Sequence, residues 1–493
     1  MPLRAVFGTA ALLIPSVSGD SYANRRAWTA AVAALAALAL ITLAYPVARA
    51  FADYEIIFNE GWNAYRQTMA AQGVPLYGSV PRYTVVNYPP VSFHVIGFLG
   101  RFLGGVNAAG RYVSLVSLAL IAILLAAIVR RFTRGLAPGL YAALSFIVWL
   151  AVFSPDRIGM NDPQLFATVF GLAGFCAFLK NPESPRILSL SAVLFALCLF
   201  TKHNLFAIPL AIGAYLLLGR AWRPFLIWAG ACLAASLVLF LAARAVDGPY
   251  LLAHMTSART YSIRAAVLRS ANYAAMFQIP VAVFLLWSWP NAASAPRRLL
   301  VLAAAAAHAI AFFFSGGYGV DRNIFFDAML LDAVILAVAL ADFEKLPSGI
   351  FAVLLLAPLL APAALAPPVL AEEAAEFAAA PRLEQEFHQT IEFIADHSGR
   401  AFCANPLVCF AAGKAEEIDM FYVPAQIALG KLPESELVNM IETYRFSTIE
   451  IGLPGGELVR PDNFSIHLMH AIERRYRIAL RNTRYAILVP KLD

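Results

Sequence analysis

The sequence predicts an all-α polytopic membrane bundle of about eleven spans, followed by a small extracytoplasmic α/β domain. Hydrophobic residues make up 60% of the chain and charged residues only 14%, and the mean hydropathy is +0.69. Apolar runs of about twenty residues recur along most of the sequence, and polarity returns only after about residue 367. A soluble chain needs a polar surface over most of its exterior, so the main solvent of this chain is expected to be lipid.

Each apolar run is interpreted as one span. The predicted spans are 27–47, 112–129, 137–153, 163–179, 187–200, 204–219, 225–246, 272–289, 299–314, 324–341 and 350–366. Two alternatives stay open for 187–200 and 204–219, which form either two short spans or one broken helix. Val91–Leu103 is too short to span and is expected to lie at the interface or to re-enter. The predicted domains are a cytoplasmic tail 1–26, a membrane domain 27–366 with an outer catalytic loop 48–90, and a C-terminal domain 367–493.

Basic residues orient this bundle. If the N-terminus is cytoplasmic, every inside segment is basic. These inside residues are Arg25, Arg26, Arg130, Arg131, Arg134, Lys180, Arg186, Arg220, Arg223, Arg297, Arg298 and Lys345. A cleaved signal peptide is not expected, because the apolar stretch Val6–Val17 is brief and contains Pro15. We therefore expect a multi-pass protein of a cell membrane, the bacterial inner membrane in particular, with the C-terminal domain outside.

Most residues capable of chemistry fall on the outer face of this topology. They are Asp53, Glu55, Glu60, Asp156, Asp162, Lys202, His203, Asp321 and Arg322. Because these residues lie at the outer ends of spans, they can line one cavity that is partly accessible to water. This is the distribution expected of an active site. A transporter would rather place ionisable groups near the midplane on broken helices and often has an internal repeat, and we find no convincing repeat.

The outer loop 48–90 contains a helical pattern from Asn59 to about Ala70. One face holds Glu60, Asn63 and Gln67, and another holds Trp62, Tyr65 and Met69. We expect this helix to lie at the interface, with its aromatic side chains among lipid headgroups and its polar stripe toward the bundle. The alternative is an amphipathic linker without chemistry.

The order of several segments resembles a known family. An acidic short helix is followed by "GVPLY", "NYPPVSFHVIGFLGRFLGG", "AGRYVSLVS", "NDPQLFATVFGLAGF" and "FTKHNLFAIPLAI". This order is similar to that of GT-C superfamily glycosyltransferases, within the branch of dolichyl-phosphate-mannose-protein mannosyltransferases, lipid A aminoarabinose transferases and core galacturonosyltransferases. The resemblance implies an enzyme that moves a sugar from a polyprenyl-phosphate donor to a lipid, glycan or protein acceptor on the extracytoplasmic side, with an outer-loop acid as the catalytic residue.

The sequence departs from this family at two acids. The family's Asp-Glu pair in the first outer loop falls on Asn59 and Glu60, and an acid before the Pro-Pro pair falls on Asn87. Two expected carboxylates are therefore amides. Asp53 lies shortly before Asn59 and serves as the missing acid only if the loop folds back, which leaves Asp53 and Glu60 as alternative bases.

Sugar transfer needs a base for the acceptor hydroxyl and positive charge, or a metal, for the departing phosphate. The predicted catalytic residues are Asp53, Glu60 and Asp162, and the predicted donor-phosphate ligands are Lys202, His203, Arg322 and Arg111. The resemblance supports Asp162, Arg111 and Lys202, which match an acid and two basic positions of relatives. Each also has a structural alternative, namely an N-cap before Pro163 for Asp162 and an interface anchor for the long basic side chains.

Other ligands follow from the same residues. A divalent metal, Mg or Mn, is a possible cofactor of the three carboxylates, although the asparagines remove charge that would favour it. No GxxxxGK[ST] cradle occurs, which disfavours a soluble nucleotide-sugar or ATP site, and no nucleic-acid partner is expected. Arg259, Arg264 and Arg269 form a basic outer loop that either binds acidic headgroups or a pyrophosphate, or is simply solvated.

The polar C-terminal segment predicts a separate α/β domain. "RLEQEFHQTIEFIADHSG" and "LPESELVNMIETYRF" predict amphipathic helices, and "STIEIGL" and "YAILVP" predict strands. Cys403 and Cys409 would face an oxidising compartment, so they form either a short-loop disulfide or two buried thiols. For the whole chain, two further functions stay open beside the glycosyltransferase: a lipid-linked sugar flippase or transporter, and a catalytically inactive relative.

Overall fold

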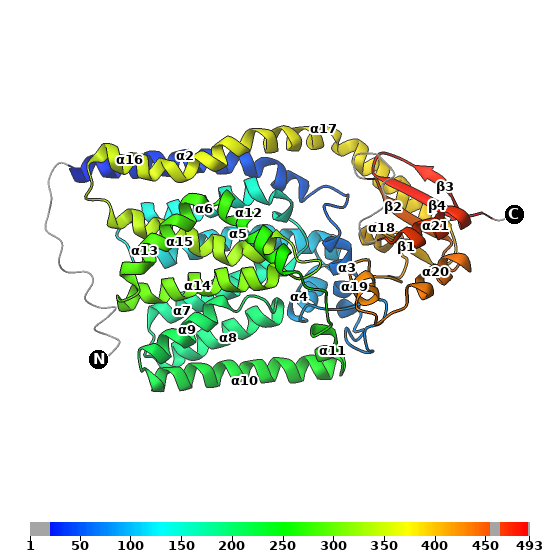
Figure 1. The fold of residues 1–493 in the computed structure, drawn as a ribbon, viewed down its shortest axis with the longest axis horizontal. Helices are drawn as coiled ribbons and strands as arrows, with labels where there is room; N and C mark the ends of the chain where they lie inside the picture. Colours follow the sequence, from blue (N-terminus) through cyan, green and yellow to red (C-terminus); the bar gives the residue numbers. More distant parts are fainter. Residues whose placement is uncertain (1–19, 454–463, 492–493) are drawn as a thin grey trace.

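The computed structural model describes residues 20–453 and 464–491. Its larger part is a bundle of apolar helices (Figure 1). The long helices are α2 (Asp20–Arg49), α5 (Val106–Val129), α7 (Pro163–Lys180), α10 (Trp222–Asp247), α14 (Ala295–Ser315), α15 (Phe326–Asp342) and α17 (Leu360–Asp396), which follows α16 (Ser348–Leu356). The shorter ones are α6 (Ala137–Phe153), α8 (Pro185–Thr201) and α9 (Ala207–Leu218), and a bent pair consists of α12 (Ile263–Met276) and α13 (Gln278–Asn291).

By length and composition, seven helices of the described residues can cross a membrane, or eight if the bent pair is one span. The prediction of a helical membrane bundle is confirmed. One predicted span, 272–289, is wrong as a straight helix, because the chain bends by 94° between α12 and α13. The segments 187–200 and 204–219 form two separate helices, α8 and α9.

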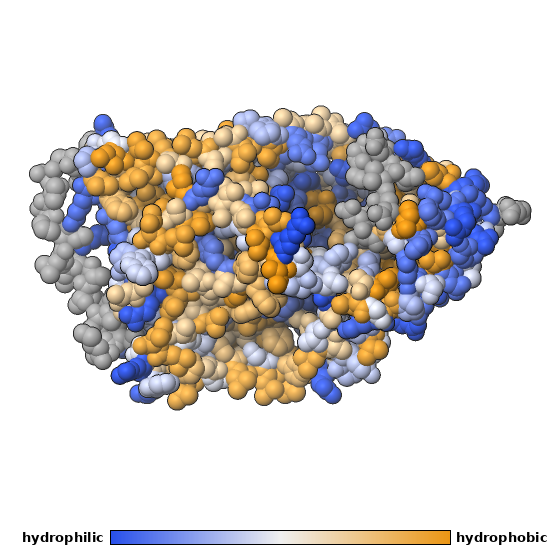
Figure 2. All heavy atoms as spheres, in the orientation of Figure 1, coloured by the Kyte–Doolittle hydropathy of each residue, from blue (hydrophilic) through white to orange (hydrophobic). Residues whose placement is uncertain are grey.

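Helix burial follows the expectation for a bundle in lipid. In the span Arg322–Asp342, which contains α15, 89% of the most apolar 18-residue stretch is buried inside the protein. In α10 the buried share of the corresponding stretch is only 6%. The exposed face of α10 is apolar, with Leu233 and Leu241 among its exposed side chains. Figure 2 shows apolar side chains over the bundle and hydrophilic ones over the C-terminal part. An exposed apolar surface of this extent is stable in lipid but not in water.

The C-terminal part is a four-stranded sheet in the order β1-β2-β4-β3 with helices packed on it. β1 (Ala401–Cys403) is parallel to β2 (Thr448–Gly452), and β4 (Tyr485–Pro490) is antiparallel to both β2 and β3 (Tyr476–Arg481). Its helices are α18 (Pro406–Ala411), α19 (Tyr422–Ala428), α20 (Glu434–Glu442) and α21 (Ile466–Arg475). The predicted strands β2 and β4 and helix α20 are confirmed. Cys403 and Cys409 form a disulfide.

Helix α17 joins the two parts. It runs without interruption from the bundle, where it lies along α2, to the C-terminal sheet (Figure 1). Pro367, Pro368 and Pro381 all lie inside it. The Ala-Pro-rich run is therefore helical, and the predicted domain boundary at 366/367 falls within a helix.

Three short helices fill the end of the bundle that faces the C-terminal part: α3 (Asn59–Ala71), α4 (Val91–Leu99) and α11 (Leu251–Met255) (Figure 1). The predicted helix at Asn59 is confirmed, but its aromatic face does not lie among headgroups. Trp62 Nε1 donates to Asp419 at 3.0 Å, and the Tyr65 hydroxyl donates to the carbonyl of Lys414 at 2.8 Å. Both acceptors belong to the C-terminal domain, so this domain covers the aromatic face of α3 and satisfies its indole and phenol donors.

Candidate active site

Glu60 forms a buried network of hydrogen bonds at the end of the bundle that faces the C-terminal part. Its side chain is fully buried, and Arg111 binds both carboxylate oxygens, with Nε 2.7 Å from Oε1 and Nη2 2.6 Å from Oε2. The amide of Asn161 also donates to Oε1 at 3.2 Å, and that of Ile56 donates to Oε2 at 2.8 Å. Each oxygen therefore already accepts two hydrogen bonds. This geometry leaves the carboxylate little capacity to take a proton from a substrate.

A stack of amides continues this network. Gln67 and Asn161 exchange two hydrogen bonds of 2.7 and 2.9 Å, and Asn63 donates to the carbonyl of Asn161 at 2.9 Å. A Cβ at Gly110 would lie 1.9 Å from Asn161 Oδ1, so the amide fits only against a glycine. The polar stripe predicted on α3 thus faces the bundle as expected, and it fixes the loop that carries Asp162.

Asp162 and Lys202 form a buried ion pair at the same end. Lys202 Nζ lies 3.0 Å from Asp162 Oδ1, and only 3% and 7% of the two residues is exposed. The same oxygen caps α7 by accepting from the amide of Gln164 at 2.8 Å. Asn59 Nδ2 lies 3.4 Å from the other oxygen. The N-cap and a polar pair are therefore both present, and the ammonium group also lies over the ring of Tyr88 at 4.6 Å.

Both members of the pair keep their charge. Burial alone would raise the pKa of the Asp162 carboxyl, but the charges of Lys202 and Arg157 outweigh it and lower the pKa below its usual value. Burial alone would lower the pKa of Lys202, but the charge of Asp162 outweighs it and raises the pKa. The site therefore holds a carboxylate and an ammonium group at neutral pH.

Arg157 is a residue of the site that the sequence analysis did not select. It ends the short helix η1 (Pro155–Arg157), is 5% exposed and pairs with Asp156 at 2.9 Å and with Asp321. Its Nη1 atom is buried without a hydrogen-bond partner among the described residues. Arg322 lies beside Asp321 and donates to the carbonyl of Phe153 at 3.0 Å. In the sequence, Arg157 stood out in one respect: it is a basic residue in a loop predicted to lie outside, where the positive-inside distribution does not account for it.

His203 follows Lys202 directly. Burial, and then the charges of Arg259 and Lys202, lower its pKa to about 4, so the ring is neutral near pH 7. Its Nδ1 atom is buried without a partner among the described residues, as are both amide atoms of Gln164 and Oδ1 of Asn204. Unpaired buried polar atoms are unfavourable, so these atoms, on residues that adjoin the ion pair in the chain, are candidates to bind the polar group of a ligand.

The same architecture occurs in solved structures. ArnT from Cupriavidus metallidurans bound to undecaprenyl phosphate aligns with a TM-score of 0.57 and 13% identity, over 93% of this chain and 97% of that one. Its apo state aligns equally well, over 93% and 98%. This chain has the GT-C fold. The oligosaccharyltransferase of Archaeoglobus fulgidus in the apo form gives 0.52 and 13% identity, over 86% of this chain and 69% of that one.

No family model and no curated protein matches this sequence. The likeness to solved structures, at 13% identity or less, therefore establishes the GT-C fold and not an activity. The resemblance inferred from the order of motifs is confirmed at the level of fold.

Within the GT-C fold of this chain, Asp53 lies apart from the Asp162–Lys202 pair. Its side chain is 76% exposed and its carboxylate lies 3.2 Å from His388 Nε2 on α17. Its backbone amide donates to Glu384 at 3.0 Å. The loop is thus held toward α17. Of the predicted residues, the structure joins Asp162 with Lys202 and Glu60 with Arg111, in two networks connected through Asn161 and Asn59.

The residues around Asp162 do not fit a divalent cation well. The ammonium group of Lys202 occupies one carboxylate oxygen, and an amide stands at position 59. No group of three or more His, Cys, Asp or Glu side chains converges in the part of the chain that the structure describes. The archaeal oligosaccharyltransferase is also described in complex with Zn and sulfate, at a TM-score of 0.51, 11% identity and 85% and 67% coverage. No step below is derived through a metal.

Proposed function

We propose that this chain transfers a sugar from a polyprenyl-phosphate donor to an acceptor hydroxyl on a lipid, glycan or protein. The observation that carries the proposal is the buried Asp162–Lys202 pair at the end of the bundle that the C-terminal domain covers. The GT-C fold supports it, and so does the undecaprenyl phosphate bound by the ArnT structure.

Each residue has a role in this proposal. Lys202, Arg157 and Arg322, with the neutral ring of His203, bind the phosphate and stabilise the charge that develops on it. The acceptor oxygen bonds to the anomeric carbon, the bond from that carbon to the phosphate oxygen breaks, and polyprenyl phosphate leaves with the electron pair. Asp162 accepts the proton of the acceptor hydroxyl.

Glu60 and Asp53 have other roles in the proposal. Glu60 and Arg111 position α3 and the loop of Asp162, because their contacts are made within the protein. Asp53, one of the two alternative bases expected from the sequence, is the second candidate for the base, after Asp162. The Cys403–Cys409 disulfide favours an extracytoplasmic C-terminal domain, since disulfides form in oxidising compartments. A multi-pass protein of the bacterial inner membrane fits this orientation.

One observation favours the alternative of a lipid-linked sugar transporter. Asp332 on α15 is fully buried among membrane helices, where it accepts from the Tyr273 hydroxyl at 2.8 Å and lies 3.3 Å from His308 Nε2. Ionisable groups at such depth are typical of transport pathways.

A product assay separates the two functions. The full chain in nanodiscs is incubated with radiolabelled polyprenyl-phosphate sugars and a membrane-lipid extract. The proposal predicts free polyprenyl phosphate together with a labelled acceptor, and loss of both in Lys202→Met but not in Lys345→Met, a control outside the site. Movement of the donor across vesicles without a glycosidic product would instead identify a transporter.

A further inference from the structure

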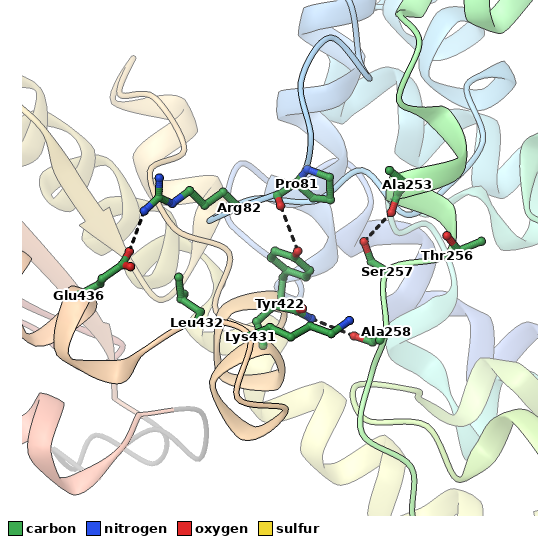
Figure 3. A pocket seen from close by; sticks show the side chains of 11 residues that line it. Pro81, Arg82, Ala253, Thr256, Ser257, Ala258, Tyr422, Lys431, Leu432 and Glu436 are labelled. Carbon is green, nitrogen blue, oxygen red and sulfur yellow. Dashed lines mark hydrogen bonds and ion pairs between the residues drawn. The ribbon is translucent and has the colours of Figure 1, made fainter.

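A pocket of about 500 Å³ lies where the C-terminal domain meets two outer loops of the bundle (Figure 3). Small-molecule sites have about 300–1,000 Å³ and often lie at domain interfaces. Its lining includes Arg82, Ala258, Tyr422, Gln426, Lys431 and Glu436. The walls therefore come from the loop after α3, the loop after α11 and the segment from α19 to α20.

Hydrogen bonds across the pocket hold these walls together. Gln426 Nε2 donates to the carbonyl of Ala258 at 2.9 Å, and the Tyr422 hydroxyl donates to that of Pro81 at 3.4 Å. The Tyr83 hydroxyl, beside Arg82, donates to Glu436 at 2.6 Å. The pocket is thus formed before any ligand binds, which reduces the entropy that binding would cost.

The charges of the lining leave one cation without a protein partner. Arg82 and Glu436 pair at 3.1 Å, so their charges offset each other. The Lys431 ammonium group makes no hydrogen bond or ion pair within the described residues, and its side chain extends along the pocket toward Ala258 (Figure 3). Hydroxyls, backbone carbonyls and the Tyr422 ring complete the surface. Such a lining suits a hydroxyl-rich ring that carries a negative group.

The pocket adjoins the candidate active site through one loop. Ala258 lines the pocket, and the next residue, Arg259, lies close enough to His203 for its charge to lower the pKa of the imidazole. His203 in turn follows Lys202, a member of the buried ion pair. The loop that lines the pocket at Ala258 is thus the same loop whose Arg259 charge acts on His203, next to Lys202.

We propose that this pocket binds the acceptor as an anionic saccharide, with Lys431 as the ligand of its phosphate or carboxylate group. The acceptor role rests on the proposed sugar transfer, and the saccharide site does not. Phosphate and carboxylate share the chemistry that Lys431 recognises, and the probes below distinguish them.

The test measures binding by saturation-transfer NMR, using the full chain in nanodiscs with glucose 6-phosphate, glucuronate and glucose. We expect one anionic sugar to bind at least about tenfold more tightly than glucose, because hydrogen bonds to charged groups are stronger than those between neutral groups. Lys431→Glu should remove that difference. Arg477→Glu, the same charge change at an exposed position of β3, should retain it. Equal binding of all three sugars, or equal loss in both variants, would overturn the saccharide site.

Turnover then tests the acceptor role separately. In the transfer assay, Lys431→Glu should raise the KM for the acceptor by about tenfold or more while the KM for the donor stays unchanged. An unchanged acceptor KM would overturn the acceptor role. If the parent protein releases no polyprenyl phosphate but still binds anionic sugars in a way that depends on Lys431, the proposed transfer is wrong and the saccharide site stands.

Discussion

The ammonium group of Lys202 lies 3.0 Å from the carboxylate of Asp162, and the pair is almost completely buried. Asp162 caps the beginning of α7, and Lys202 follows the end of α8. These helices are consecutive and similar in length, so their connection brings the two residues to the same end of the bundle. Removing one partner of a buried ion pair destabilises the protein, because the other charge stays buried without compensation.

The first prediction separates catalysis from stability at this pair. Asp162→Asn or Lys202→Met should reduce transfer by roughly a hundredfold or more and lower the thermal midpoint, because each leaves an unpaired buried group. The double variant should regain much of the stability and none of the transfer. Released polyprenyl phosphate and thermal unfolding are measured on the same samples. Recovery of transfer in the double variant would mean that the pair is only structural.

The second prediction concerns Glu60. Glu60→Gln should destabilise the protein by about 3–5 kcal/mol, because Arg111 loses its buried counter-charge. Asp342→Asn, which breaks a partly exposed pair with Arg297, should change stability by only about 0–1 kcal/mol. Chemical denaturation in detergent gives both values. A Glu60→Gln protein of parental stability with a reduced kcat would instead favour Glu60 as the base.

The third prediction concerns the contact between α3 and the C-terminal domain. A Cβ at Gly61 would lie 2.0 Å from the backbone nitrogen of Leu407, so Gly61→Ala should push α18 away from α3. Limited proteolysis should then cleave the C-terminal domain faster, and transfer should fall. Gly230→Ala on α10 is the matched control, because nothing lies within 4 Å of its added Cβ. Similar cleavage of both variants would contradict this contact.

The fourth prediction is a pH dependence at the same contact. Burial, and then the charges of Glu450 and Glu60, raise the pKa of Glu55 to about 8, while Leu407 and Arg484 oppose the shift. Burial raises the pKa of Glu450 to about 7. Between these pKa values and the ordinary glutamate pKa of 4.5, the folded protein holds protons that the unfolded chain has released. The free energy of unfolding should therefore fall as the pH rises from about 4.5 to 8, by up to about 1.4 kcal/mol per group and pH unit.

Thermal unfolding at pH 5.5 and 8 measures this dependence. Glu55→Gln should flatten it and raise the midpoint at pH 8, because the neutral amide needs no proton. A midpoint that rises with pH in the parent protein would contradict the predicted direction.

The fifth prediction concerns metal removal. EDTA should leave transfer within about twofold of its starting rate, because Lys202 already neutralises the Asp162 carboxylate. Loss of transfer on chelation, with recovery on adding Mg²⁺ or Mn²⁺, would show that the reaction requires a divalent cation. Binding of the polyprenyl-phosphate donor, measured in the same samples, is the control for integrity of the site.

The residues differ in how far the sequence could predict their surroundings. Asp162 and Lys202 were predictable, because each stands at the end of an apolar run and both ends face the same side. Glu60 was predicted on the correct face of its helix, but its partner Arg111 lies 51 positions away and was assigned to the donor phosphate. Arg157 was passed over, because one arginine in a short loop carries no pattern.

Hydropathy and periodicity were enough to predict the membrane bundle, the helix at Asn59 and the polar C-terminal domain, because both are local properties that set how each segment partitions between lipid and water. The contacts of the charged residues became clear only in the folded protein. There the aromatic face of α3 packs on the C-terminal domain, both carboxylate oxygens of Glu60 are hydrogen-bonded, and Asp53 is exposed. The role of a charge depends on burial and on partners distant in the chain, and these are fixed only when the helices pack.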